Sequence, residues 1–536
     1  MARTRTKYVE LTDDDYYDAY DSDYYLDEEE EEEEVERRPV VPIVKAKAKA
    51  CVKEKSSPVK QQAKLDHGRA VKSQGNSEEP SSPSIENYSC VVLGHVDSGK
   101  STLMGHLFVS LGLISESVIR RFKKESEVIG KGSFAYAWVF DDCEDERERG
   151  ITINVSAKSM MIEDKLVTFL DAPGHSEFIP NSFSVSMFSD NTIIVIDSSG
   201  FEAGFLRGQT IEHIIYSLLA DSANIIIAIN KLDLFNWDEQ VYSSIVKKIS
   251  DYIEYELSDI KSNSNIIFLP ISAYCGVNIL NDAKNTIPKE VSSWYQGPSL
   301  FEILSSIGTN KKRSKTRPIE CQCHTDPKNF AAFSACILDI ISTSSSEFKG
   351  SLYIEYGTLK VGQSYLIPPF TESVKCKAIS VNNKTYTSCT GPIYISLATF
   401  SCSTNPGIGN IIVSTSSSKS SGRRSSNTPI SSLITNIYPV QISKRLKIRC
   451  LKLLNEVSLS SKNIIWNVPG HSFMLYYHFE ASPAILLNVK DDIFYFETDC
   501  DIVSYNKCQC DDPTNLGKVS VRYFGITVMI GEMLFH

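Results

Sequence analysis

Eight residues near the start of the apolar part of the chain have the types and spacing that bind a polyphosphate. The stretch GHVDSGKS, Gly94 to Ser101, satisfies the pattern G-x-x-x-x-G-K-[ST] between an apolar run and a helical pattern. Its glycines let backbone N–H groups turn toward phosphates, and the helix N-terminus that follows favours the same negative charge. Lys100 would reach the outer phosphates, and Ser101 would place its hydroxyl on Mg2+. This predicts a nucleotide site that contains Gly94, His95, Val96, Asp97, Ser98, Gly99, Lys100, Ser101 and Thr102.

A second group of residues selects the base. Asn230, Lys231 and Asp233 form the motif NKLD, in which the Asp233 carboxylate can accept both N–H groups on the Watson–Crick edge of guanine. Adenine offers a mismatched pattern there, and a buried polar group left unpaired costs about 1–3 kcal/mol. The stretch Ser272, Ala273, Tyr274 follows another apolar run, and its backbone can contact the guanine oxygen. The expected ligands are therefore GTP and GDP.

Two further segments predict hydrolysis of the γ-phosphate. Thr152 in ERERGITI would ligate Mg2+ through its hydroxyl and bind the γ-phosphate through its N–H, so that the segment is ordered only with triphosphate. In DAPGH, Asp171 would hold Mg2+ through water and Gly174 would offer its N–H to the γ-phosphate. His175 follows at once and would orient the attacking water. No arginine finger can be assigned, so intrinsic hydrolysis should be slow until a partner completes the site.

Short apolar runs precede these motifs and must position them. The runs are rich in β-branched residues and are closed by Gly, Asp or Asn, which is typical of buried parallel strands. Helical patterns lie between them, at 99–112 and 208–222. We therefore expect an α/β P-loop GTPase domain, doubly wound, over residues 86–305. The runs are 88–93, 166–170, 191–197, 224–230 and 265–272.

The rest of the chain changes character after a basic connector, KKRSKTRP at 311–318. It is rich in strand-like runs with little helical period, and a serine-rich break at 414–427 divides it. The pattern predicts two antiparallel β-barrels, domain II at 317–413 and domain III at 430–536.

The start of the chain has a different composition. Residues 1–36 hold 16 acidic and 3 basic side chains, whereas the whole chain has a net charge of −11. Residues 1–85 are expected to be a disordered arm, acidic and then basic, because they contain too few apolar groups to offset chain entropy. No secretory signal and no run of about 20 apolar residues is visible, which predicts a cytoplasmic protein with no membrane span. The CxC pairs Cys321/Cys323 and Cys508/Cys510 lack zinc-site spacing, so we expect no zinc.

The motifs, taken in this order, resemble those of the translational GTPases of the elongation factor 1-alpha superfamily. The resemblance implies a G domain followed by two β-barrels, with His175 as the catalytic residue that the large ribosomal subunit brings into place. It also implies that Val96 and Ile151 form an apolar gate, which screens His175 from the water until activation.

Details within the superfamily resemble the Hbs-type ribosome-rescue GTPases that partner Pelota. They are SFAYAWVFD at 133–141, Pro180 in HSEFIPN, and GFEAGF at 200–205. The resemblance implies a cytoplasmic monomer that contacts large-subunit rRNA and the small subunit. It would deliver Pelota, a release-factor mimic, to stalled ribosomes in no-go and non-stop mRNA surveillance.

Three alternatives stay open at this point. They are the translation-termination GTPase, an elongation factor 1-alpha-like carrier of aminoacyl-tRNA, and a non-hydrolysing adaptor to RNA-decay machinery. Intact Lys100, Thr152 and His175 argue against the adaptor. The barrels match the family only thinly, because KNFAAFSACILDI at 328–340 lacks the usual glycine-rich opening and the serine-rich insert is foreign.

Overall fold

The structure is a computed structural model that describes most of the chain from residue 86 onward. The predicted arm, residues 1–85, and the two CxC pairs lie outside the described residues. The described residues are 86–128, 136, 138, 156–173, 179–207, 209–260, 262–280, 288–308, 333–344, 346–368, 370, 373–381, 384–391, 393–402, 405–414, 440–454, 467–477, 480–505, 517–523 and 526–534.

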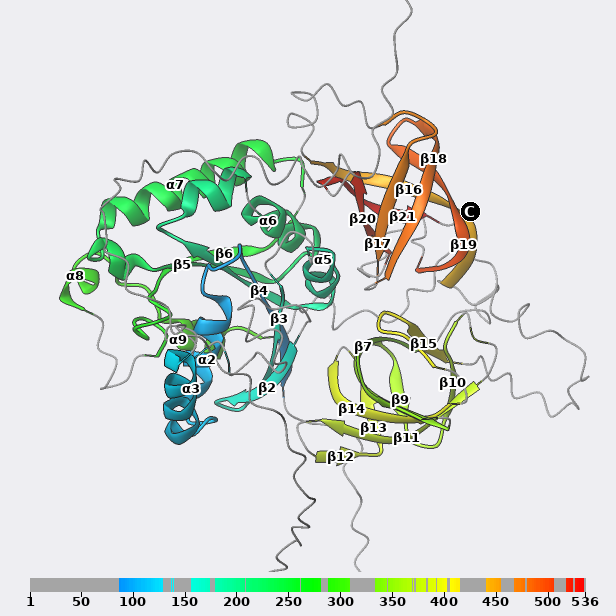
Figure 1. The fold of residues 1–536 in the computed structure, drawn as a ribbon, viewed down its shortest axis with the longest axis horizontal. Helices are drawn as coiled ribbons and strands as arrows, with labels where there is room; N and C mark the ends of the chain where they lie inside the picture. Colours follow the sequence, from blue (N-terminus) through cyan, green and yellow to red (C-terminus); the bar gives the residue numbers. More distant parts are fainter. Residues whose placement is uncertain are drawn as a thin grey trace, which may run out of the picture. The chain divides into compact units, whose positions relative to one another are not determined.

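A six-stranded sheet in the order β2-β3-β1-β4-β5-β6 forms the centre of the first domain (Figure 1). Neighbouring strands run parallel except β2 and β3, which are antiparallel. The carboxyl ends of the five parallel strands therefore share one edge, where ligands bind in sheets of this kind. The strands are β1 (Asn87–Leu93), β2 (Ser156–Ile162), β3 (Lys165–Asp171), β4 (Asn191–Asp197), β5 (Asn224–Asn230) and β6 (Asn265–Pro270).

Helices cover both faces of this sheet (Figure 1). Alternate side chains of β1 show why, because Cys90 and Val92 belong to the core shared with α2, α3 and α9. Val91 and Leu93 belong to the other core, shared with α5, α6 and α7. The helices are α2 (Lys100–Ser110), α3 (Glu116–Val128), α5 (Ile179–Phe188), α6 (Thr210–Leu219), α7 (Glu239–Glu256), α8 (Lys289–Ser292) and α9 (Leu300–Ser306), with a π-helical turn η4 (Ala203–Arg207) and a 3-10 turn η5 (Leu232–Phe235).

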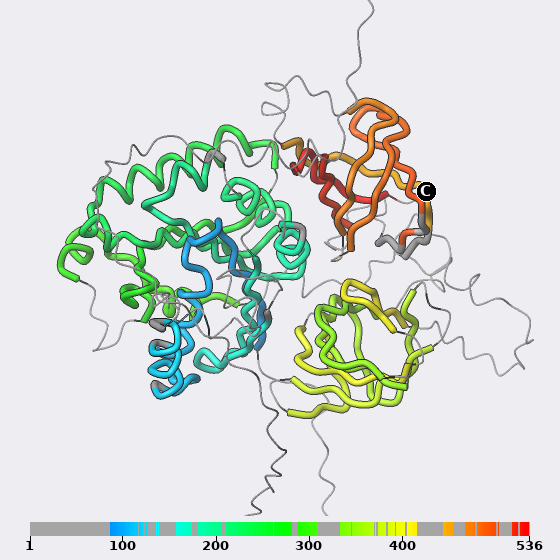
Figure 2. The backbone as a smooth tube through the Cα atoms, in the orientation of Figure 1, coloured from blue at the N-terminus to red at the C-terminus, as the bar shows by residue number. Residues whose placement is uncertain are grey.

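The second domain is an antiparallel barrel. Its strands follow the order β10-β15-β7-β8-β14-β11, and pairing of β10 with β11 closes the sheet. The backbone of this domain, yellow-green in Figure 2, runs round a ring. Strand β12 extends the sheet beside β11, and β9 pairs with β13. The strands are β7 (Ser334–Thr343), β8 (Glu347–Tyr356), β9 (Thr358–Lys360), β10 (Ser364–Leu366), β11 (Ser373–Val381), β12 (Lys384–Tyr386), β13 (Ser388–Thr390), β14 (Ile393–Ser401) and β15 (Ile411–Ser414).

The third domain is also a closed barrel, in the order β16-β19-β18-β17-β20-β21. The first and last of its strands, β16 and β21, pair and close it. A core that includes Leu446, Ile448, Phe496 and Val521 fills the interior. The strands are β16 (Val440–Leu453), β17 (Ser472–Tyr477), β18 (Glu480–Lys490), β19 (Ile493–Tyr505), β20 (Lys518–Tyr523) and β21 (Ile526–Leu534).

The predicted architecture, an α/β P-loop domain followed by two antiparallel β-barrels, is confirmed. The boundaries 86–305, 317–413 and 430–536 stay predictions. Strand β2 was not among the predicted strands. It is an antiparallel strand at the edge of the sheet. Lys158 is partly buried and Met161 is exposed, so this strand lacks the continuous apolar run that is typical of the central strands. Among the described residues, the helices include none long and apolar enough to cross a membrane.

Candidate nucleotide-binding site

The loop between β1 and α2 has a backbone that only glycine fits at two positions. Gly94 has φ 150°, and a Cβ there would lie 2.3 Å from the Val195 carbonyl oxygen. Gly99 has φ 93°, and a Cβ there would lie 2.4 Å from Nδ2 of Asn230. Both values are below any real Cβ contact, so the two glycines allow the loop to pack against β4 and β5. The loop thus has the close backbone approach that its sequence predicts.

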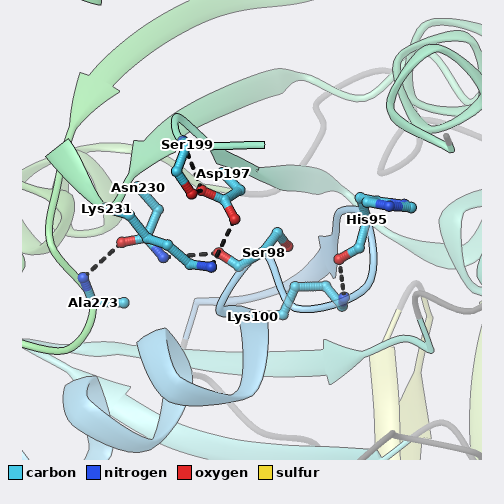
Figure 3. Close-up of polar contacts among 8 residues, drawn as sticks. All are labelled: His95, Ser98, Lys100, Asp197, Ser199, Asn230, Lys231 and Ala273. Carbon is cyan, nitrogen blue, oxygen red and sulfur yellow. Dashed lines mark hydrogen bonds and ion pairs between the residues drawn. The ribbon is translucent and has the colours of Figure 1, made fainter. Parts of the chain in front are cut away.

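Lys100 begins α2 and folds back over the loop. Its Nζ donates to the carbonyl oxygens of Gly94 and His95, each at 2.9 Å, as Figure 3 shows for the His95 contact. The side chain is buried, and burial lowers the pKa of Lys100 to about 8, although Asp171 and Asp97 act in the opposite direction. The ammonium is therefore held beside the loop, and a bound anion there would raise the pKa of Lys100 again.

This shift predicts a pH dependence of nucleotide binding. Below about pH 8 the Lys100 ammonium is already charged, whereas above it the phosphates must raise the pKa of Lys100 and draw a proton from solvent. Affinity for GDP should therefore fall about tenfold per pH unit above that value. Isothermal titration in buffers of different ionisation enthalpy should show more proton uptake per GDP at pH 8.5 than at pH 7.5. Equal uptake at both values would contradict the assignment.

Asn230 joins three of the predicted motifs. Its Nδ2 donates to the Ser98 carbonyl at 2.8 Å, and its Oδ1 accepts from the Ala273 N–H at 2.8 Å (Figure 3). Asn230 is buried at the end of β5, and the chain then turns through Lys231 into η5, which contains Asp233. The phosphate loop, NKLD and the segment 272–274 are thereby fixed to one another at the carboxyl edge of the sheet.

The predicted metal ligands that the structure describes also lie together. The Ser101 hydroxyl donates to Oδ2 of Asp171 at 3.1 Å, and Asp171 is fully buried at the end of β3. A hydroxyl and a carboxylate are oxygen donors of the type that Mg2+ prefers, so the pair fits the ion. Four predicted residues lie outside the described part of the chain: Ile151, Thr152, Gly174 and His175.

The remaining predicted residues occupy the same edge. His95 and Val96 are half-buried, Asp97 is exposed, and Thr102 lies in the first turn of α2. His95 bonds through Nδ1 to the side chain of Gln209, directly before α6. Ser272 and Ala273 are buried, whereas Tyr274 is 60% exposed.

A buried histidine behind the loop affects its electrostatics. His213 in α6 is fully buried, and burial, with a contribution from the Lys100 charge, lowers the pKa of His213 to about 3. The imidazole is therefore neutral at ordinary pH and adds no positive charge behind the phosphate loop.

Three contacts at the site were not predicted. Asp197 pairs with Lys231, its Oδ2 lying 2.6 Å from Nζ (Figure 3). His106 of α2 donates from Nδ1 to the Ala273 carbonyl at 2.9 Å and stacks on Tyr136 with ring centroids 4.5 Å apart. The sequence does contain one indication that Asp197 belongs to the site. Asp197 stands at the end of an apolar run, as Asp171 and Asn230 stand at the ends of two others.

Sequence comparisons with known proteins agree with the assignment of a guanine-nucleotide site. Residues 86–323 match the elongation factor Tu GTP binding domain. The chain is 34% identical over 295 residues to Protein HBS1 of Drosophila melanogaster, an alignment that covers 54% of this chain and 41% of that protein. It is also 34% identical over 299 residues to elongation factor 1-alpha of Entamoeba histolytica, covering 55% of this chain and 62% of the relative. The chain thus spans less than two thirds of the length of each of these relatives. The predicted resemblance to the elongation factor 1-alpha superfamily and its Hbs-type members is confirmed.

A comparison of structures extends the fold likeness to the barrels. The Ski7 GTPase-like domain of S. cerevisiae, bound to GDP and inorganic phosphate, matches with a TM-score of 0.62. That match covers 84% of this chain and 98% of the Ski7 domain. Because the sequence identity is 18%, the match shows a common fold and nothing about function.

Proposed function

We propose, on the premise that residues 86–323 belong to the elongation factor Tu GTP-binding domain family, that this protein binds and hydrolyses GTP on the ribosome. The observation that supports this most strongly is the Asn230 side chain, which bonds both Ser98 and Ala273 and so joins the phosphate loop to the base-reading segment. A site that reads guanine needs the base contacts held at a fixed position relative to the phosphate contacts, and the Asn230 side chain provides that link.

GTP would lie along the carboxyl edge of the sheet. The backbone of residues 94–100 and the Lys100 ammonium would bind the phosphates, and Asp233 would accept from the guanine edge. Ser101 and Asp171 would hold Mg2+, with Thr152 as a further ligand, and the ion would neutralise charge on the β- and γ-phosphates. His175 would orient the attacking water once the ribosome aligns it, with Val96 and Ile151 as the apolar gate and Gly174 on the γ-phosphate.

The proposed task is delivery of a Pelota-type release-factor mimic to stalled ribosomes, in no-go and non-stop mRNA surveillance. The 34% identity to Protein HBS1 supports it, together with the segments at 133–141 and 200–205. The identity to elongation factor 1-alpha is equal in size, so the G domain alone does not select the delivered partner. We propose that the protein acts as a cytosolic monomer that contacts large-subunit rRNA and the small subunit.

The partner is tested by GTP-dependent capture and by activity. The full chain, loaded with a non-hydrolysable GTP analogue or with GDP, is mixed with Pelota, the stop-codon release factor or charged tRNA. We expect retention of Pelota with the GTP analogue only, and GTP hydrolysis on ribosomes that increases when Pelota is added.

Each of the three alternative functions predicts a different result in this experiment. Retention of the stop-codon factor would support the termination GTPase, and retention of charged tRNA would support the elongation-type carrier. A chain that binds GTP but shows no hydrolysis on ribosomes with any of the three would support the adaptor.

A further inference from the structure

Asp197 ends β4 beside the residue that ends β5. The two strands are parallel, with Asp197 opposite Asn230 in the register. The Ser198 N–H donates to the Asn230 carbonyl at 3.0 Å and fixes the two strand ends to each other. The Asp197 side chain is thereby placed next to Lys231, the residue that follows Asn230.

Lys231 has a backbone conformation that a residue with a Cβ rarely adopts. Its φ is 63°, in the left-handed region, at the turn from β5 into η5. Its Nζ lies 2.6 Å from Oδ2 of Asp197, with side-chain exposures of 32% for the lysine and 18% for the aspartate. The ion pair therefore holds a long and otherwise adaptable side chain in one place, partly withdrawn from solvent.

Ser199 fixes the carboxylate from its other side. The Ser199 N–H donates to Oδ1 of Asp197 at 2.9 Å, and the Ser199 hydroxyl donates to the same oxygen at 2.6 Å (Figure 3). Burial by itself would raise the pKa of Asp197, but the hydrogen bonds from Lys231 and Ser199 lower it below its usual value. The group is thus an ionised carboxylate with one oxygen committed to Ser199 and the other to Lys231.

We propose that Asp197 is a positioning residue for guanine-nucleotide binding, which acts by holding the Lys231 ammonium at the base end of the site. This inference rests on the proposed function. Without the carboxylate, the lysine side chain samples many rotamers, and a nucleotide must order it on binding. Lys231 lies between Asn230 and Asp233, at the end of the site that would bind the base. GDP and GTP carry the same base, so a disordered Lys231 side chain should weaken the binding of both.

The test is a double-mutant cycle on the full chain, with affinities from isothermal titration of GDP and of a non-hydrolysable GTP analogue. Asp197→Asn should weaken both by about three- to tenfold, the range for loss of one ordinary hydrogen bond in a partly exposed pair. Lys231→Ala should weaken both as well. Adding Asp197→Asn to Lys231→Ala should have almost no further effect, since the aspartate acts through the lysine.

A matched control is available five residues along the same segment. Glu202 forms an exposed ion pair with Lys248, neither of which is among the predicted nucleotide-site residues, and Glu202→Gln should leave both affinities unchanged. Asp197→Glu keeps the charge and should recover part of the lost affinity. If thermal melting without nucleotide shows that Asp197→Asn does not fold, Asp197→Ala takes its place in the cycle.

The outcomes separate this inference from the proposed function. Unchanged affinity in Asp197→Asn, or the same fold-loss in the Lys231→Ala background as in the parent, would overturn the positioning role while leaving GTP binding in place. Failure of the parent chain to bind GDP would instead overturn the proposed function, and the inference with it.

Discussion

The Asp233→Asn variant is expected to prefer xanthosine triphosphate over GTP. The carboxylate accepts from two N–H groups of guanine, whereas the amide presents a donor that suits the C2 oxygen of xanthine. Each mismatch leaves a polar group unpaired, at about 1–3 kcal/mol, so GTP affinity should fall about five- to 150-fold and xanthosine triphosphate affinity should rise by a similar factor. Competition of the two nucleotides for the full chain measures both changes.

The structure provides a matched control for this variant. Asp238 lies five positions further on, is exposed, and caps α7 by accepting from the Gln240 N–H at 2.8 Å. Asparagine caps helices as well as aspartate does, so Asp238→Asn should change neither stability nor nucleotide preference. Unchanged GTP affinity in Asp233→Asn would contradict the assignment of NKLD to guanine.

The His175→Ala variant is expected to lose ribosome-stimulated GTP hydrolysis by about 100- to 1,000-fold, the range for removal of one group that stabilises a transition state. His175 lies outside the described residues, but the described Asp171 and Ser101 place the preceding end of β3 at the phosphate loop. Single-turnover hydrolysis on ribosomes measures the loss.

The same variant carries its own control. Its affinity for GTP in the absence of ribosomes should be unchanged, because His175 would contact only the attacking water. Hydrolysis on ribosomes as fast as in the parent would remove His175 from the mechanism. Weakened GTP binding would show that the residue supports the nucleotide site instead.

The nucleotide site could be predicted largely because its residues follow strands. Gly94, Asp171 and Asn230 each come at or directly after the end of an apolar run, and parallel strands bring their carboxyl ends to one edge whatever their order in the sheet. The contact of Asp197 with Lys231 needs more, because it exists only if β4 and β5 are neighbours. That adjacency depends on the strand order of the whole sheet, which the sequence of neither strand specifies by itself.

The barrels show a different limit of prediction from sequence, because one of their long strands carries few of the residues by which strands are recognised. Strand β16 is the longest of the third domain, but five of its 14 residues are lysine or arginine, and it was not among the predicted strands. The buried Leu446 and Ile448 alternate with Lys447 and other basic residues that lie on the outer side of the barrel. Strands are usually recognised by β-branched and aromatic residues, which this outward side lacks.

Closure of the two barrels affects how freely their sequences can diverge. In a closed ring, each strand finds backbone partners on both sides, so the ring needs only that every second side chain fill the interior. The outward side chains are released from that requirement, and substitutions there leave the backbone pairing intact. Such a domain can exchange one binding partner for another over evolutionary time without passing through an unfolded intermediate. The G domain lacks that freedom, because its motifs must meet one nucleotide. This difference agrees with a family match that ends at residue 323 and a likeness of fold that covers 84% of the chain.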